Sequence, residues 1–444
     1  MRRHPLWAIT FGAFALRSAY VLIVRPDPLN MIDSAEYDAL ARGILAGHGI
    51  TNLITFARPP LYPLFVAVCY VVGGIGALVL AQLLLSAATA PLVGSLARAL
   101  TGRPTAGIAA AAVVAIYPWF FQWVGGLASE TLFTFLLVSA LTLIFRANAS
   151  PRAGPILLAG VAFGVASLTR ANALVLGPPI ALWWWWRAHD LRPPLVLALG
   201  VFLALVPYAV YNLANGNGPV LASNGGGLQF YIGNNPDTVR LYDPATPEAE
   251  WRALSDISNL GPAALEQVGC AHAAPFGQLD EERLEAGECL VSVPSDQREA
   301  FWYRGAFEYI RTHPSEWTLL ELRKLAHYWR PWVEPRAYSM PVVVVSGLSF
   351  GALLLLALAG LRSMPRGAAL FVLAVAAGST LSSVVWNVYL RYRFAMLDPI
   401  LIAAAGQPLV AIVHRLGTQV PALRGSAKPD DVETPSRQPG EPLL

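Results

Sequence analysis

Residues 33–45 read Asp-Ser-Ala-Glu-Tyr-Asp-Ala-Leu-Ala-Arg-Gly-Ile-Leu, and residues 58–63 read Arg-Pro-Pro-Leu-Tyr-Pro. This acidic, Tyr- and Arg-bearing stretch lies between two long apolar segments, at 6–24 and 76–98. Carboxylate and guanidinium groups at a membrane surface are costly unless they are solvated or paired, which makes them candidates for chemistry. A solvated connector between two membrane spans is the alternative interpretation of the same residues.

Apolar side chains dominate the composition of this 444-residue chain. Hydrophobic residues make up 55% and charged residues only 13%, and the mean hydropathy is +0.50. Soluble domains carry about 25% charged residues, so the composition predicts an all-α polytopic membrane protein. The net charge of +3 is small and argues against nucleic acid as a partner.

The apolar runs predict about ten transmembrane helices, because one span needs about 20 predominantly apolar residues. We place them at residues 6–24, 76–98, 105–121, 127–146, 154–171, 172–187, 193–211, 340–361, 367–388 and 395–414. The shorter apolar run at 60–73 is interpreted as an interfacial or re-entrant segment. With that interpretation, arginine pairs flank the spans on one side, and the positive-inside rule places both termini in the cytoplasm.

These spans predict four regions. They are a transmembrane module at 1–211 with its first outer loop at 25–75, an outer region of mixed structure at 212–339 between the seventh and eighth spans, C-terminal transmembrane helices at 340–417, and a disordered cytoplasmic tail at 418–444. Residues 237–294 are polar and predicted to be irregular. Cys270 and Cys289 share this outer segment, where an oxidising compartment favours a disulfide, with two free thiols as the alternative.

Charged residues that are far apart in the sequence fall on the outer face in this topology. They are Asp33, Glu36, Arg58, Glu130, Arg391 and Arg393. Structural alternatives exist, since Glu130 could cap its helix and the arginines could anchor lipid headgroups. Arg170 could bind an anionic group or pair with Glu130. Arg17, inside the first span, is expected to pair or snorkel.

Several short motifs resemble those of the membrane glycosyltransferases of the C-type fold. The closest likeness is to the bacterial branch of the protein O-mannosyltransferase and aminoarabinose transferase superfamily, which is glycosyltransferase family 39-like. The motifs are Asp33…Tyr37 with Leu45-Ala-Gly-His-Gly49, Arg58-Pro-Pro-Leu-Tyr-Pro63, Ser129-Glu-Thr-Leu132, Leu168-Thr-Arg-Ala-Asn172, Tyr231-Ile-Gly-Asn-Asn-Pro236 and Arg391-Tyr-Arg393. Each motif is weak alone, but together they follow the family order over residues 6–414.

The resemblance implies roles for individual residues. Asp33 matches the catalytic base or acceptor-positioning group, and Glu130 matches a second acidic residue of the same cavity. Arg58 matches the basic residue that contacts the lipid phosphate. The remaining residues assigned to the donor are Tyr37, Arg170, Arg391 and Arg393.

The sequence departs from the family pattern at two positions. Some relatives carry an acidic residue of a metal site directly before the basic position, where this chain has Ala57. Dependence on a divalent metal ion is therefore left open. Proline often follows the Leu-Thr-Arg triplet in the family, where this chain has Ala171.

The implied function is transfer of a sugar from a polyprenyl-phosphate-linked donor to a lipid, glycan or protein acceptor, by inverting displacement. It would take place among membrane lipids at the outer face of the bacterial cytoplasmic membrane, where nucleotide sugars are not generally available. Arginine suits a phosphate leaving group, and a carboxylate can take the proton of an acceptor hydroxyl. The alternatives are a transporter or lipid flippase and an O-antigen polymerase or ligase. The residues leave the sugar, the acceptor and the oligomeric state open.

Overall fold

The described part of the chain consists of helices joined by turns, without a strand. The computed structural model describes residues 4–24, 27–29, 33–50, 58–149, 152–216, 218–259 and 295–419. The helices long and apolar enough to cross a membrane are α1 (His4–Val24), α3 (Leu61–Thr101), α6 (Glu130–Ala147), α9 (Arg192–Ala214), α17 (Met340–Ser363) and α18 (Arg366–Val384). The predicted all-α polytopic class is confirmed.

Shorter or bent helices occupy the other predicted spans. α19 (Leu390–Met396) and α20 (Asp398–Gln419) form a pair bent by 53°. The remaining members are α4 (Pro104–Ile116), α5 (Trp119–Gln122), α7 (Ala153–Ser167), the 3-10 helix η1 (Ala171–Leu176) and α8 (Gly177–Ala188). Every predicted span thus coincides with helix, whereas ten membrane crossings stay a prediction.

The run at 60–73 forms the first turns of α3 and leads directly into the span predicted at 76–98. Non-helical backbone at Gly73 and Gly74 interrupts α3, and Gly74 has φ 65°. That left-handed conformation is open to glycine at little steric cost. The break lies where the interfacial segment was predicted to end, and its depth in a membrane stays a prediction.

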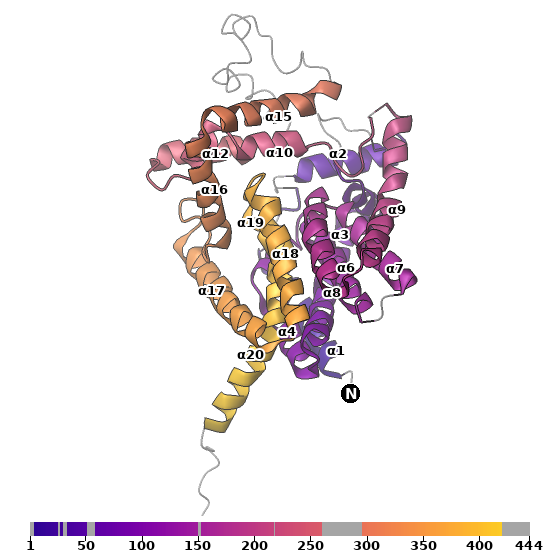
Figure 1. Ribbon diagram of the computed structural model, residues 1–444, viewed down its shortest axis with the longest axis vertical. Helices are drawn as coiled ribbons and strands as arrows, with labels where there is room; N and C mark the ends of the chain where they lie inside the picture. Colours follow the sequence, from indigo (N-terminus) through magenta and orange to yellow (C-terminus); the bar gives the residue numbers. More distant parts are fainter. Residues whose placement is uncertain are drawn as a thin grey trace, which may run out of the picture.

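Helices from two separate regions cover one end of the bundle. Figure 1 shows α2 (Ser34–Leu45), α10 (Gly226–Gly233), α12 (Glu248–Asn259) and α15 (Ser295–Thr312) lying across the tops of the long helices. The N-terminal end of α1 and the far end of α20 lie at the opposite end. α2, from residues 25–75, and α10, α12 and α15, from residues 212–339, therefore share one end of the molecule.

The irregular structure predicted for 237–294 is wrong at its start. α11 (Pro236–Leu241) and α12 are helical, and Cys270 and Cys289 lie outside the described residues. The side chain of Asn235 accepts a hydrogen bond from the backbone N–H of Thr238 at 2.9 Å, which caps α11, and Pro236 suits its first turn. The polar composition of this segment suggested irregular structure, although the segment begins with a capped helix.

A buried lysine fastens α10 to the C-terminal helices. Lys324, on α16 (Pro314–Trp329), is fully buried, pairs with Glu321 at 2.5 Å and donates to the carbonyl of Gly233 at 3.1 Å. A Cβ at Gly233 would lie 1.3 Å from the carbonyl oxygen of Trp386, so only glycine permits this approach. Asn234 adds a bond to the carbonyl of Val385 at 3.0 Å.

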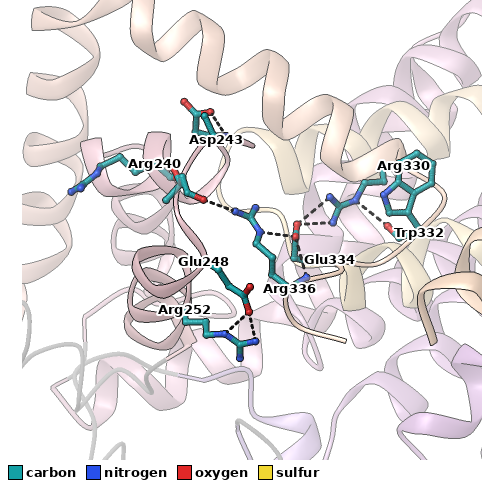
Figure 2. Close-up of polar contacts among 10 residues, drawn as sticks. Arg240, Asp243, Glu248, Arg252, Arg330, Trp332, Glu334 and Arg336 are labelled. Carbon is teal, nitrogen blue, oxygen red and sulfur yellow. Dashed lines mark hydrogen bonds and ion pairs between the residues drawn. The ribbon is translucent and has the colours of Figure 1, made fainter. Parts of the chain in front are cut away.

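Figure 2 shows a charged network that holds the loop after α16 against the segment before α12. Glu334 accepts from Arg330 at 3.1 Å and from Arg336 at 2.8 Å, and Arg336 also donates to the carbonyl of Thr246 at 3.3 Å. The guanidinium of Arg336 lies 4.7 Å from the ring centroid of Trp251. These contacts join two parts of residues 212–339 to each other.

Arg17, in the middle of α1, contacts backbone rather than a carboxylate. It is fully buried and donates to the carbonyls of Val114 at 2.8 Å and Ala115 at 3.1 Å, near the end of α4. Its Nε donates to Ser86 at 2.7 Å. The last carbonyls of a helix need such partners, so Arg17 has the pairing role expected for it.

Helices α7 and α9 touch through small residues. A Cβ at Gly160 would lie 2.2 Å from the carbonyl oxygen of Leu197, and one at Gly200 would lie 2.4 Å from that of Leu157. Close backbone approach through small residues is a common basis of helix association in membranes, where dispersion rather than the hydrophobic effect favours contact.

Gly160→Val should therefore destabilise the protein by about 1–3 kcal/mol, the usual cost of overpacking. Gly154→Val, in the first turn of the same helix, is the matched control because a Cβ there meets nothing within 4 Å. Thermal unfolding in detergent measures both. Equal melting temperatures for the two variants would show that the α7–α9 contact is not tight.

Candidate active site

Six ionisable side chains from distant parts of the sequence meet near the end of the bundle covered by α2. This charge cluster consists of the carboxylates Asp33, Glu36 and Glu130 and the guanidinium groups of Arg58, Arg170 and Arg391. Their side chains are between 3% and 16% exposed. Buried charges persist only when they are paired, and here ion pairs link all six.

Asp33 lies at the centre of the charge cluster. Its Oδ1 accepts from Arg58 at 3.1 Å and its Oδ2 from Arg391 at 2.8 Å. It occupies the N-cap position of α2, where an aspartate usually accepts a backbone N–H of the first turn. Its side chain makes no such capping bond, so both oxygens serve the arginines instead.

The pKa of the Asp33 carboxyl lies well below its usual range. Burial opposes ionisation of this group, but the positive charges of Arg391, Arg58 and Arg170 outweigh burial. An opposite charge within a few ångströms favours the charged form of a carboxyl. Asp33 is therefore ionised in this arrangement, and the arginines beside it make it a weaker base than a free aspartate.

Arg58 joins Asp33 to Glu36 and contacts two tyrosines, Tyr37 and Tyr208. Its guanidinium pairs with the Glu36 carboxylate and lies 5.6 Å from the ring centroid of Tyr37. Its carbonyl accepts from the hydroxyl of Tyr208 on α9 at 2.9 Å. Tyr37 packs edge-on against Tyr62 with centroids 4.7 Å apart. These contacts fix Arg58 at the start of α3.

Tyr37 reaches this position because α2 is amphipathic. Tyr37, Leu40 and Ala41 are buried at helical spacing, while Arg42 is exposed and pairs with Asp38 at 2.8 Å. Apolar residues three and four positions apart form one face of a helix. Burial of that face turns Glu36 and Asp33, at the start of α2, toward Arg58.

Glu130 and Arg170 form the second half of the charge cluster. Glu130 is the first residue of α6, where the helix dipole favours a carboxylate, and it pairs with Arg170 at 2.8 Å. Arg170 also donates to the hydroxyl of Ser129 at 2.9 Å. Of the two alternatives left open for Arg170, the structure thus contains the pairing with Glu130.

Arg391, on α19, connects the two halves. It is paired with Asp33 and lies 3.8 Å from Glu130. Tyr392 packs between two arginines, with its ring centroid 5.5 Å from the guanidinium of Arg391 and 4.6 Å from that of Arg170. An aromatic face attracts cations, so the ring of Tyr392 stabilises the guanidinium groups of both Arg391 and Arg170, whose charges the carboxylates balance.

Arg393 does not join the charge cluster. It is fully buried, donates to the carbonyls of Tyr328 at 3.1 Å and Arg330 at 2.8 Å, and lies 3.6 Å from Asp398. Positions two apart on a helix point to different sides, which separates Arg393 from Arg391. Its contacts connect α19 to the end of α16. The role predicted for Arg393 at the donor phosphate stays a prediction, and in this structure its guanidinium is fully buried away from the charge cluster.

Three members of the site had weak sequence signals. Glu36 stands three residues after Asp33, and on a helix this spacing places the two side chains side by side. Ser129 precedes Glu130, and Tyr392 lies between two arginines. Within the described ranges, no group of three or more His, Cys, Asp or Glu residues is placed to hold a metal ion.

Comparison with known proteins agrees with this architecture. Residues 57–211 match the family model described as dolichyl-phosphate-mannose-protein mannosyltransferase. No curated protein matches the chain. Among solved structures, the apo oligosaccharyltransferase of Archaeoglobus fulgidus is similar, with 16% identity, a TM-score of 0.54, and coverage of 94% of this chain and 52% of that one.

A second structure of that enzyme, in complex with Zn and sulfate, has 15% identity, a TM-score of 0.52, and coverage of 93% of this chain and 50% of that one. The chain therefore spans about half the length of the solved structures it matches. Identity at this level shows a shared fold. The chain shares the fold of that oligosaccharyltransferase over most of its own length, and the match to the mannosyltransferase model covers residues 57–211.

Proposed function

We propose that this integral membrane protein is a glycosyltransferase that moves a sugar from a polyprenyl-phosphate-linked donor to an acceptor hydroxyl. The observation that carries the proposal is the convergence of Asp33, Glu130, Arg58 and Arg391 in one charge cluster. Cations placed where negative charge develops stabilise a phosphate leaving group. A carboxylate among them can take the proton of the attacking hydroxyl.

The proposed reaction is a single displacement with inversion. The acceptor oxygen forms a bond to the anomeric carbon while the bond from that carbon to the phosphate oxygen breaks. The acceptor proton goes to Asp33, and the electron pair of the broken bond stays on the phosphate. Arg58 and Arg391 bind the phosphate, Glu130 keeps Arg170 and Arg391 in place, and no covalent sugar–enzyme intermediate forms.

The proposed location of the reaction is the outer face of the cytoplasmic membrane. In the predicted topology the arginine-rich turns lie on the cytoplasmic side. The helices α2, α10, α12 and α15 share one end of the bundle, and Asp33 and Glu36 of the charge cluster lie at the start of α2. A lipid-linked donor suits this side because its activated sugar stays tethered to the membrane. A lipid, a glycan or a protein can supply the acceptor hydroxyl.

The test is a transfer assay in sealed membrane vesicles with a radiolabelled, water-soluble polyprenyl-phosphate sugar. We expect incorporation of label in right-side-out vesicles, none in inside-out vesicles, and none when a nucleotide sugar replaces the lipid-linked donor. Movement of the labelled lipid between leaflets without transfer of its sugar would favour a flippase. Transfer only in inside-out vesicles would overturn the proposed orientation.

A further inference from the structure

The arginines of the charge cluster are already engaged by carboxylates. Asp33 uses one oxygen for Arg58 and the other for Arg391. Arg58 also pairs with Glu36, and Arg170 pairs with Glu130. Three carboxylates face three guanidinium groups, so the formal charges of these six side chains balance. A phosphate that enters this site must therefore draw a cation away from an existing pair.

Building on the proposed function, we infer that Asp33 and the donor phosphate compete for Arg58 and Arg391. When Asp33 takes up the acceptor proton, it loses its negative charge, and the two arginines pair with the leaving phosphate instead. Arg58 and Arg391 are the more accessible arginines, with side chains 16% and 15% exposed against 9% for Arg170. An arginine has five N–H donors in a planar fork, so it can contact both groups while the exchange takes place.

Charge balance explains why the exchange helps the reaction. As the glycosidic bond breaks, the phosphate changes from a singly charged diester to a monoester that carries a second negative charge. In the same step the acceptor proton neutralises Asp33. One negative charge disappears at Asp33 while one appears on the phosphate, so the net charge of the buried site stays constant.

The same exchange tunes the base. Burial opposes ionisation of Asp33, whereas Arg391 and Arg58 favour it. A phosphate that draws either cation away therefore raises the pKa of the Asp33 carboxyl and makes it a stronger base. Asp33 would become a stronger base only when a donor is bound. It would therefore take up the acceptor proton only in complexes that contain the donor.

The inference predicts that removal of the Asp33 charge tightens binding of the lipid phosphate. In Asp33→Asn, Arg58 and Arg391 lose a buried partner, and an uncompensated buried charge is costly. A bound phosphate restores that partner, so its dissociation constant should fall by about tenfold, the value of a charge-assisted hydrogen bond. Glu36→Gln releases Arg58 alone and should tighten binding by a smaller factor.

The experiment measures binding of a short-chain polyprenyl phosphate to the purified full-length protein by titration calorimetry. The uncharged polyprenol of the same length reports binding of the lipid chain alone and should not distinguish the variants. Asp38→Asn is the matched control, because it removes one negative charge from the same helix but outside the charge cluster, from a pair with Arg42, which is 64% exposed. It should bind polyprenyl phosphate like the wild type.

Tighter binding of polyprenyl phosphate by Asp33→Asn, with polyprenol binding unchanged, supports the inference. Equal or weaker binding by a folded Asp33→Asn protein overturns it and leaves the proposed function intact. If that variant does not fold, Glu36→Gln decides in the same way. A wild-type protein that binds polyprenol as tightly as polyprenyl phosphate would overturn both the inference and the proposed donor class.

Discussion

Asp33→Asn should lower the rate of sugar transfer by about 10²–10⁴-fold, the usual contribution of a general base. Asparagine retains the size and the hydrogen-bonding oxygen of the side chain but cannot take a proton from the acceptor. The central position of Asp33, between Arg58 and Arg391, makes it the carboxylate best placed for that step. Single-turnover transfer from a radiolabelled lipid-linked donor measures the effect.

The control for this prediction is Asp38→Asn on the same helix, which should transfer at the wild-type rate. Membrane insertion and the melting temperature of both variants show whether a loss of rate reflects folding. A folded Asp33→Asn protein with near-normal transfer would show that Asp33 is not the base, even if the fold and the donor class are right.

Arg58→Ala should weaken both donor binding and turnover. The phosphate is charged in substrate and product alike, so the loss of one cation should raise KM for the donor by about tenfold and lower kcat as well. The substitution also leaves Asp33 and Glu36 with fewer partners at a site where Arg58 is only 16% exposed. Breaking a buried pair from one side costs about 3–5 kcal/mol.

Arg42→Ala is the matched control for Arg58→Ala. Arg42 pairs with Asp38, is 64% exposed and lies on α2 outside the charge cluster, so its loss should change neither transfer nor melting temperature noticeably. Steady-state kinetics over a range of donor concentrations, together with thermal unfolding, separate the two effects. An unchanged KM in a folded Arg58→Ala protein would place the donor phosphate elsewhere.

The helical class could be predicted because the apolar runs are long and nearly free of charge. The predicted spans fall on helices throughout, and even the boundary of the segment at 60–73 coincides with the break at Gly73 and Gly74. The number of crossings was harder, since α4 and α7 are shorter than a full span. Length and hydropathy describe a helix by itself, whereas neighbouring helices can shield a short one from lipid.

The sequence allowed prediction of which residues belong to the site, but not of which side chains form ion pairs with one another. Asp33, Arg58 and Arg391 were all candidates, yet no local pattern specifies that residues 358 positions apart share a hydrogen bond. Arg393 shows the limit most clearly. It stands two residues from Arg391 and has the same chemistry, but the turn of α19 directs it to carbonyls at the end of α16.

The measurement that tests the central claim most directly is an electron cryo-microscopy structure of the full-length protein with a polyprenyl phosphate bound. The account predicts phosphate oxygens within hydrogen-bond distance, about 3 Å, of Arg58 and Arg391, with at least one of the two Asp33 contacts lengthened or broken. A lipid phosphate bound elsewhere, with the Arg58–Asp33 and Arg391–Asp33 pairs unchanged, would contradict it.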